Sequence, residues 1–133
     1  MMPDKRKILY VEDEQFLMGG LIDLLSLSYT VITARNADQA IDLLEREAGL
    51  ELILLDVMLP EGQKIRDPNR GRTAGLELVK KAKEKGISLP IICYTVVMDE
   101  KVLGELNELG ATIISKAMSS SHLLSVIKDV IEG

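Results

Sequence analysis

The stretch LILLDV, residues 52–57, places four aliphatic residues in a row and then an acid. An apolar run without polar alternation indicates a strand buried on both faces, as in a parallel sheet. The aspartate in this stretch, Asp56, lies where the carboxyl ends of parallel strands meet and where such sheets bind ligands. Similar runs at residues 7–11, 29–34, 89–97 and 111–115 predict four further strands.

Segments with helical spacing of apolar residues alternate with these strands, at residues 14–27, 37–47, 74–85, 99–109 and 119–131. Asp99 and the serine cluster that begins at Ser119 are suitable helix N-caps, and Gly86 suits a C-terminal cap. The strand–helix unit occurs five times in succession. We therefore predict an α/β fold with a doubly wound, five-stranded parallel sheet of the flavodoxin-like (βα)5 type.

Length and composition limit the classes of protein that remain. The 133 residues suit a single domain over residues 1–133. A net charge of −5 argues against direct binding of nucleic acid, which needs a basic surface. No apolar run approaches the roughly 20 residues that cross a bilayer, so we expect neither a membrane span nor a signal peptide. The single cysteine, Cys93, permits no internal disulfide and favours a reducing, cytoplasmic location.

Five polar side chains lie at the predicted strand ends: Glu12 and Asp13 after the first strand, Asp56 after the third, Thr95 after the fourth and Lys116 after the fifth. In the strand order 2-1-3-4-5 the chain reverses between strands one and three, which brings the three carboxylates together. Crowded carboxylates need positive charge, which Mg²⁺ and Lys116 can supply. Such a site suits phosphoryl transfer to Asp56, with the Thr95 hydroxyl as a donor to a phosphoryl oxygen.

Four motifs carry a resemblance to a known family: VEDE at residues 11–14, LLDVMLP at 54–60, IICYTV at 91–96 and IISKA at 113–117. From about residue 7 to residue 131 the chain resembles the receiver domains of two-component response regulators. The resemblance implies that Asp56 accepts a phosphoryl group, assisted by Thr95 and Lys116. It also implies that Mg²⁺ is bound by Asp13, Asp56 and the Met58 backbone carbonyl, with Glu12 acting through water.

The same resemblance implies the partners of the domain. A sensor histidine kinase or a phosphotransfer protein of a phosphorelay would supply the phosphoryl group. The domain would be a signalling switch, not an enzyme, that assists its own phosphorylation and dephosphorylation. An output partner or domain would bind the face formed by helix four, strand five and helix five, and the domain could form a dimer.

An insert at about residues 61–74 departs from the family pattern. Such connections usually span about 2–6 residues, and the glycine expected soon after Pro60 is Gly75, 15 positions later. The insert holds four of the 16 basic residues: Lys64, Arg66, Arg70 and Arg72. Our hypothesis is a flap or a partner-recognition surface. The alternative is a solvated loop without a function.

Three residues near the predicted site also depart from the pattern. Ala117 follows Lys116 where the family usually has proline, so we expect a trans bond or a strained loop. Ile113 replaces the aromatic switch residue often found three positions before that lysine. Val96 is bulkier than the small residue often found after the threonine, and we expect it to narrow access to Asp56. These departures leave room for a degenerate receiver that binds its partner without phosphorylation.

Two other classes fit the sequence less well. Phosphatases of the haloacid dehalogenase type usually carry a second aspartate two residues after the nucleophile, where this chain has Met58. A flavodoxin-like cofactor binder would need a phosphate cradle after the first strand. The segment EDEQF at residues 12–16 is acidic and lacks the glycines of such a cradle.

Overall fold

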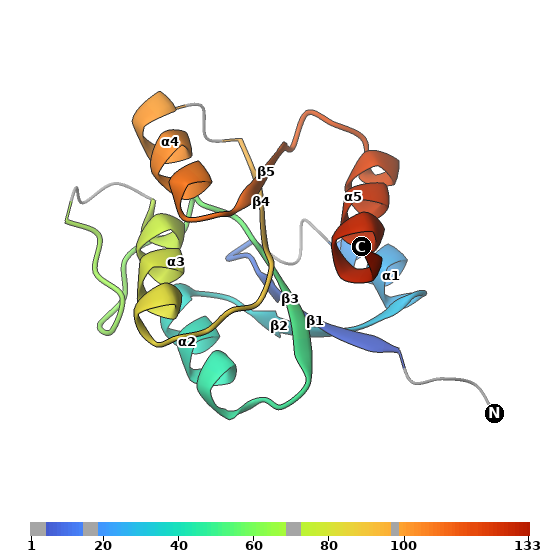
Figure 1. Cartoon of the computed structure of the whole chain (residues 1–133), viewed down its shortest axis with the longest axis horizontal. Coiled ribbons are helices and arrows are strands. Elements are labelled where there is room, and N and C mark those ends of the chain that lie inside the picture. Colours follow the sequence, from blue (N-terminus) through green and yellow to red (C-terminus); the bar gives the residue numbers. More distant parts are fainter. Residues whose placement is uncertain (1–4, 15–18, 69–72, 97–98) are drawn as a thin grey trace.

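The structure is a computed structural model that describes residues 5–14, 19–68, 73–96 and 99–133. Its strands form one parallel sheet in the order β2-β1-β3-β4-β5, which confirms the predicted fold class and strand order (Figure 1). The strands are β1 (Arg6–Val11), β2 (Tyr29–Ala34), β3 (Leu50–Leu55), β4 (Ile91–Thr95) and β5 (Thr112–Ser115).

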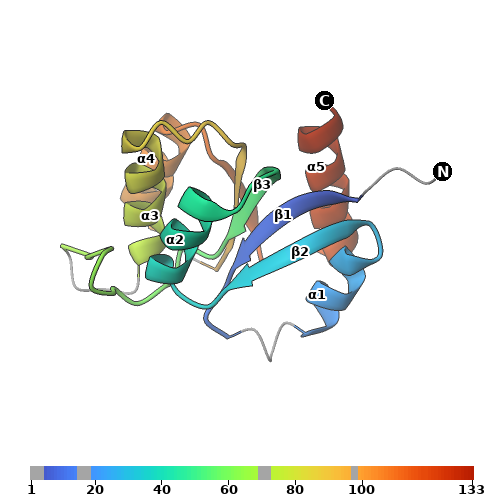
Figure 2. The same ribbon diagram turned by 90° about the horizontal axis from the view of Figure 1, so that it is seen from below.

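Helices cover both faces of this sheet. In Figure 2, α1 and α5 lie on one side of it, and α2, α3 and α4 lie on the other. The helices are α1 (Gly19–Ser26), α2 (Ala37–Arg46), α3 (Ala74–Glu84), α4 (Glu100–Glu108) and α5 (Ser120–Glu132). Among the described residues, no helix combines the length and apolarity that a membrane crossing needs.

The element boundaries differ slightly from the prediction. The strand predicted at residues 52–57 begins at Leu50 and ends at Leu55, so Asp56 lies just beyond it. The Asp56 backbone N–H still donates to the Val11 carbonyl at 3.0 Å, which holds this end of β3 against β1. The strand predicted at 89–97 spans only Ile91–Thr95. Residues 15–18 of the first predicted helix, and Val97, lie outside the described residues.

The sheet is buried on both sides, which explains its uninterrupted apolar strands. Neighbouring residues of β1 and β3 point to opposite faces. Leu9 and Leu55 join the cluster under α2 and α3. Ile8 and Leu54 join the cluster under α1 and α5. From Ile8 to Val11 and from Leu52 to Leu55 every residue is buried, so at the carboxyl edge an acid can follow only where the strand ends.

Side-chain caps fix where three helices begin. The Asn36 side chain accepts a hydrogen bond from the Gln39 backbone N–H at the start of α2. Asp99 accepts from Lys101 and Val102 at the start of α4, as predicted. Ser119 of the predicted serine cluster caps α5. These caps set the lengths of the connections that leave the carboxyl edge of the sheet.

The first half of the insert is bound to α2. The Asp38 carboxylate accepts backbone hydrogen bonds from Gln63 at 2.8 Å, Lys64 at 3.1 Å and Ile65 at 2.9 Å. Gly62 lies so close that a Cβ atom there would be 2.5 Å from an Asp38 carboxylate oxygen. The Ile65 side chain is 2% exposed and belongs to the core cluster under α2 and α3. This half of the insert is therefore an ordered part of the fold.

The second half of the insert is closed by Asp67, which is buried. Its carboxylate accepts from the backbone N–H and the hydroxyl of Thr73 at 3.1 Å and 3.0 Å. Its own N–H donates to the Glu61 carboxylate at 3.0 Å. These bonds bring the two ends of the insert together beside the start of α3. Arg70 and Arg72, part of the predicted recognition surface, lie outside the described residues.

Gly75 keeps its place against the backbone that follows Asp56, despite the insert. Its N–H donates to the Val57 carbonyl at 3.2 Å. A Cβ atom at this position would lie 2.6 Å from the Val57 Cα and 2.7 Å from the Asp56 carbonyl oxygen. Only glycine fits here without moving the chain that carries Asp56.

We predict that Gly75→Ala lowers the free energy of unfolding by about 2 kcal/mol, because the added methyl group forces two backbone segments apart. Gly104→Ala is the matched control, since a Cβ there meets nothing within 4 Å. It should raise stability by about 0.5–1 kcal/mol through its helix propensity. Chemical denaturation measures both, and equal effects of the two variants would contradict the close packing at Gly75.

We predict that Asp38→Asn frees residues 63–65 and lowers the free energy of unfolding by about 2 kcal/mol, since charged hydrogen bonds are lost. Amide hydrogen exchange at these residues should accelerate. Asp42→Asn, which breaks the exposed ion pair to Lys64, should leave the free energy of unfolding close to that of the parent. Unchanged exchange in Asp38→Asn would show that the carboxylate does not anchor the insert.

The same anchor has a pH dependence. Burial acts to raise the pKa of Asp38, but the backbone hydrogen bonds from Ile65, Lys64 and Gln63 outweigh it and hold the pKa below its usual value. The stability that Asp38 contributes is therefore complete above its unfolded pKa of about 3.9 and is lost as pH falls through the lower folded value.

Candidate functional site

A pocket opens at the carboxyl edge of the sheet, where the predicted site residues converge. Segments that follow β1, β3, β4 and β5 line it. Its lining residues are Asp13, Glu14, Asp56, Met58, Val96 and Lys116. The two remaining predicted residues, Glu12 and Thr95, are buried and reach the site through hydrogen bonds. The structure thus brings all the predicted site residues together.

The Lys116 ammonium group joins two buried carboxylates. Its Nζ donates to Glu12 Oε1 at 2.6 Å and to Asp56 Oδ2 at 2.8 Å. Glu12 is 1% exposed and Asp56 is 5% exposed. The same Nζ lies 5.9 Å from the centre of the Tyr94 ring, within the range of a cation–π contact. One side chain from the end of β5 therefore balances charges at the ends of β1 and β3.

Three hydrogen bonds orient the Asp56 carboxylate. Oδ1 accepts from the Thr95 hydroxyl at 2.9 Å and from the Met58 backbone N–H at 3.0 Å. Within the described part of the chain, Oδ2 accepts from Lys116 alone. A carboxylate offers about four acceptor positions, so Oδ2 keeps the capacity for one more bond. Asp56 is thus held in one orientation, with one oxygen still able to react.

Burial and charge act against each other at this site. Burial raises the pKa of Glu12, although the Lys116 hydrogen bond opposes this. Burial acts to lower the pKa of Lys116, but its hydrogen bonds to Asp56 and Glu12 outweigh it and raise the pKa. Lys116 therefore stays charged at neutral pH. Burial, and then the Asp56 charge, raises the pKa of Cys93 to about 12, so this thiol is not a nucleophile at neutral pH.

The donor set suits Mg²⁺ better than a metal that needs a full protein cage. Within the described part of the chain, no three acidic, histidine or cysteine side chains converge to enclose a metal. Mg²⁺ does not need such a cage, because it keeps several waters and takes one or two carboxylates. Asp13, Asp56 and Met58 lie together on the wall of one pocket, which fits this requirement.

The Lys116–Ala117 peptide bond is trans, since no cis bond occurs among the described residues. This is the first of the two predicted alternatives. The Ala117 N–H donates to the Ser115 hydroxyl at 3.0 Å, a bond that proline could not make. The Lys116 N–H donates to the Thr95 carbonyl at 3.0 Å. From this geometry the Lys116 side chain reaches both carboxylates.

Val96 and Ile113 are the two other residues that depart from the family pattern. Val96 is 54% exposed and lines the pocket, and its effect on access to Asp56 remains a prediction. Ile113 packs against the core cluster under α2 and α3.

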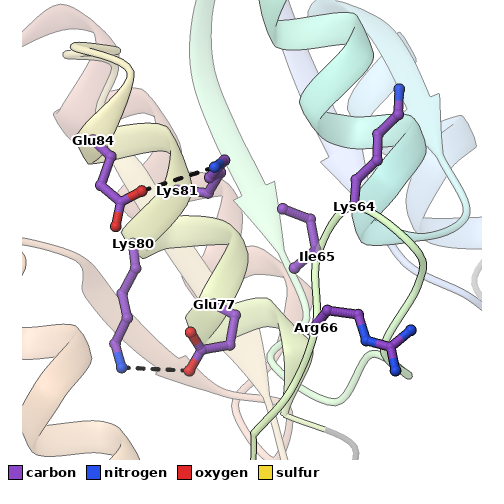
Figure 3. Close-up of a pocket in the computed structure, with 7 residues that line it drawn as sticks. All are labelled: Lys64, Ile65, Arg66, Glu77, Lys80, Lys81 and Glu84. Atoms are coloured by element: carbon purple, nitrogen blue, oxygen red, sulfur yellow. Dashed lines mark hydrogen bonds and ion pairs between the residues drawn. The ribbon is translucent and has the colours of Figure 1, made fainter.

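The described part of the insert lies beside α2 and α3, away from the pocket of Asp56. A second pocket separates it from α3 (Figure 3), where Ile65 faces the gap, Lys64 extends toward α2 and Arg66 points outward. Lys64 pairs with Asp42, and Arg66 lies 3.6 Å from Glu61. Among the described residues of the insert, none lines the Asp56 pocket. A role in covering Asp56 or in recognising a partner remains a prediction.

Two tyrosines near the site gave no signal in the sequence. Tyr10 and Tyr94 are nearly fully buried in the cluster under α1 and α5. Tyrosine is a common strand residue, so neither position stood out. Tyr10 could have been found from its spacing, because it lies two residues before Glu12 and shares its side of the strand.

The sequence and the fold of the chain match one family. The family described as "Response regulator receiver domain" matches residues 8–128. The chain is 35% identical over 108 residues to the transcriptional regulatory protein CiaR of Streptococcus pneumoniae, covering 79% of this chain and 42% of CiaR. It is 32% identical over 130 residues to the alkaline phosphatase synthesis transcriptional regulatory protein PhoP of Bacillus subtilis, covering 95% of this chain and 48% of PhoP.

Solved structures show the same fold. The CheY-like response regulator receiver domain of Methanospirillum hungatei superposes with a TM-score of 0.78 at 24% identity, covering 97% of this chain and 95% of that chain. The chain belongs to the receiver-domain family of response regulators. It spans less than half the length of CiaR and of PhoP.

We predict that Lys116→Met lowers the free energy of unfolding by about 3 kcal/mol, because it leaves two buried carboxylates without their cation. Adding Asp56→Asn to Lys116→Met should recover part of this loss. Lys80→Met is the control, since Lys80 forms only partly exposed pairs with Glu77 and Glu105 and should cost at most about 1 kcal/mol. Urea denaturation that gives Lys116→Met the stability of the parent would refute the buried ion network.

Proposed function

We propose that the chain accepts a phosphoryl group on Asp56 in a Mg²⁺-dependent reaction, and that this modification switches its binding to a partner. The orientation of Asp56 carries the proposal: Thr95, Met58 and Lys116 bond its carboxylate at the wall of an open pocket. The donor would be a phosphohistidine on a sensor histidine kinase or a phosphotransfer protein. A receiver domain assists this transfer and the later hydrolysis, and acts as a switch.

The roles of the residues follow from their contacts. An Asp56 oxygen forms a bond to phosphorus while the bond between phosphorus and the donor nitrogen breaks. Lys116, already 2.8 Å from Asp56, neutralises charge on the transferring oxygens. Mg²⁺ supplies further positive charge at those oxygens when bound by Asp13, Asp56 and the Met58 carbonyl, with Glu12 acting through water. The Met58 N–H keeps the carboxylate oriented throughout.

Thr95 is placed to pass the change on. Its hydroxyl now donates to Asp56 Oδ1, and a phosphoryl oxygen would compete for it. Thr95 is the last residue of β4, and α4 begins a few residues later behind the Asp99 cap. In α4 only Val102 and Leu106 are buried, whereas α3 buries six residues. A shift at Thr95 would therefore move α4 more readily than α3.

We propose the face of α4, β5 and α5 as the surface that meets an output partner or a further domain. CiaR and PhoP are named as transcriptional regulatory proteins. The acidic charge of this chain argues against its own contact with nucleic acid, so a partner would carry the output. Dimerisation and a cytoplasmic location belong to the same proposal.

The test is incubation with acetyl phosphate and Mg²⁺, followed by intact mass measurement. We expect the mass to rise by one phosphoryl group. We expect no such gain when Mg²⁺ is chelated before acetyl phosphate is added, and none in Asp56→Asn. Asp13→Asn should need about tenfold more Mg²⁺, since one carboxylate ligand is lost. Asp42→Asn, an exposed acid paired with Lys64, should react like the parent.

No mass gain in the parent, together with partner binding that is the same in Asp56→Asn, would replace this proposal by the degenerate receiver. Turnover of a phosphate ester would instead indicate a phosphatase.

A further inference from the structure

We propose that the Tyr10 hydroxyl is a positioning group that holds the Glu12 carboxylate when Lys116 turns toward a phosphoryl group on Asp56. The inference rests on the proposed function, because it concerns the phosphorylated state of the same site. It assigns a role to a residue outside the set of acids, threonine and lysine already described.

The Tyr10 hydroxyl is buried without a hydrogen-bond partner among the described residues. The residue as a whole is 1% exposed, in the middle of the cluster under α1 and α5. Burying a hydroxyl without a partner costs about 1–3 kcal/mol. Phenylalanine would fill the same space without this cost, so the hydroxyl needs a reason beyond packing.

Tyr10 lies beside the charged part of the site. It precedes Glu12 by two residues at the end of β1, so both side chains lie on the same side of the sheet. A tyrosine hydroxyl is protonated at neutral pH and is therefore available as a hydrogen-bond donor.

Glu12 has an oxygen that is poorly satisfied. Its Oε1 accepts the 2.6 Å bond from Lys116, whereas among the described residues Oε2 accepts only a 3.5 Å contact from the Glu14 N–H. Such a distance is at the outer limit of a hydrogen bond. Among the described residues, a buried donor without an acceptor and a buried acceptor without a good donor thus lie two positions apart in the chain, at Tyr10 and Glu12.

Phosphorylation would change the balance between these groups. The Lys116 ammonium group has a third N–H for a phosphoryl oxygen on Asp56, and a shift toward that oxygen would lengthen its bond to Glu12. Glu12 would then be a buried carboxylate with a weaker bond to Lys116, even where one of its oxygens faces a water of the proposed Mg²⁺ site, and a poorly bonded buried charge is costly. A bond from Tyr10 lowers this cost. The Tyr94 ring supports Lys116 in its observed position by a cation–π contact.

The experiment compares Tyr10→Phe with the parent in two measurements. The first is the affinity for beryllofluoride in the presence of Mg²⁺, measured by calorimetry. Beryllofluoride serves here as a stand-in for the phosphoryl group. The second is the free energy of unfolding without these ligands. We expect Tyr10→Phe to bind beryllofluoride about five- to tenfold more weakly while its unliganded stability is equal to or above that of the parent.

Tyr29→Phe is the matched control, because Tyr29 packs against the same cluster from β2 and pairs with Arg6, at the far end of β1 from Glu12. It should bind beryllofluoride like the parent. In a Glu12→Gln background, Tyr10→Phe should cause less than a twofold further change, since the carboxylate that it serves is gone.

Each outcome separates the proposals. Parent-like affinity in Tyr10→Phe, or a lower unliganded stability with unchanged affinity, overturns the role of Tyr10 and leaves Asp56 as the phosphoacceptor. If the parent itself binds no beryllofluoride with Mg²⁺, the proposed function fails and this inference fails with it. An equal loss of affinity with and without Glu12 shows that Tyr10 does not act through that carboxylate.

Discussion

The ion network of Lys116, Glu12 and Asp56 is the constraint on which the site depends. Its members come from positions far apart in the sequence, and only the parallel order of β1, β3 and β5 brings them to one edge. With Asp13 and Glu14, which line the same pocket, the site formally carries four carboxylates and one ammonium group, a net charge of −3. One divalent cation would offset most of this charge. The fold thus holds an uncompensated negative site that favours the ion a phosphoryl acceptor needs.

Most of this arrangement could be predicted from the sequence. Uninterrupted apolar runs specify buried parallel strands, and acids at the ends of such runs must lie at the carboxyl edge of the sheet. Asp56, Asp13 and Lys116 were found in this way. The two bonds of Lys116 could not be predicted, because strand order brings side chains near one another but rotamers decide which of them touch.

The structure of the insert could not be predicted from its sequence pattern. Its composition, with four basic residues and two glycines between residues 61 and 73, is typical of an exposed loop. The structure instead buries Ile65 and Asp67 and bonds the backbone to Asp38, at least 25 positions earlier. A hydrogen bond from a side chain to a distant backbone N–H leaves no periodic trace. The result is a reinforced α2–α3 pair on the same face of the sheet as a lightly packed α4, so movement is expected in α4 first.

The hydrogen bonds that Asp38 accepts from the insert affect which residues the insert can carry. The Asp38 carboxylate accepts from the backbone N–H groups of residues 63–65, which every residue except proline possesses. These bonds therefore do not depend on which side chains stand at Gln63 and Lys64. Gly62 and Ile65 are constrained, because a Cβ atom at Gly62 would collide with Asp38 and the Ile65 side chain fills the core. Evolution or protein engineering can therefore change the surface side chains at Gln63 and Lys64 while the loop keeps its shape.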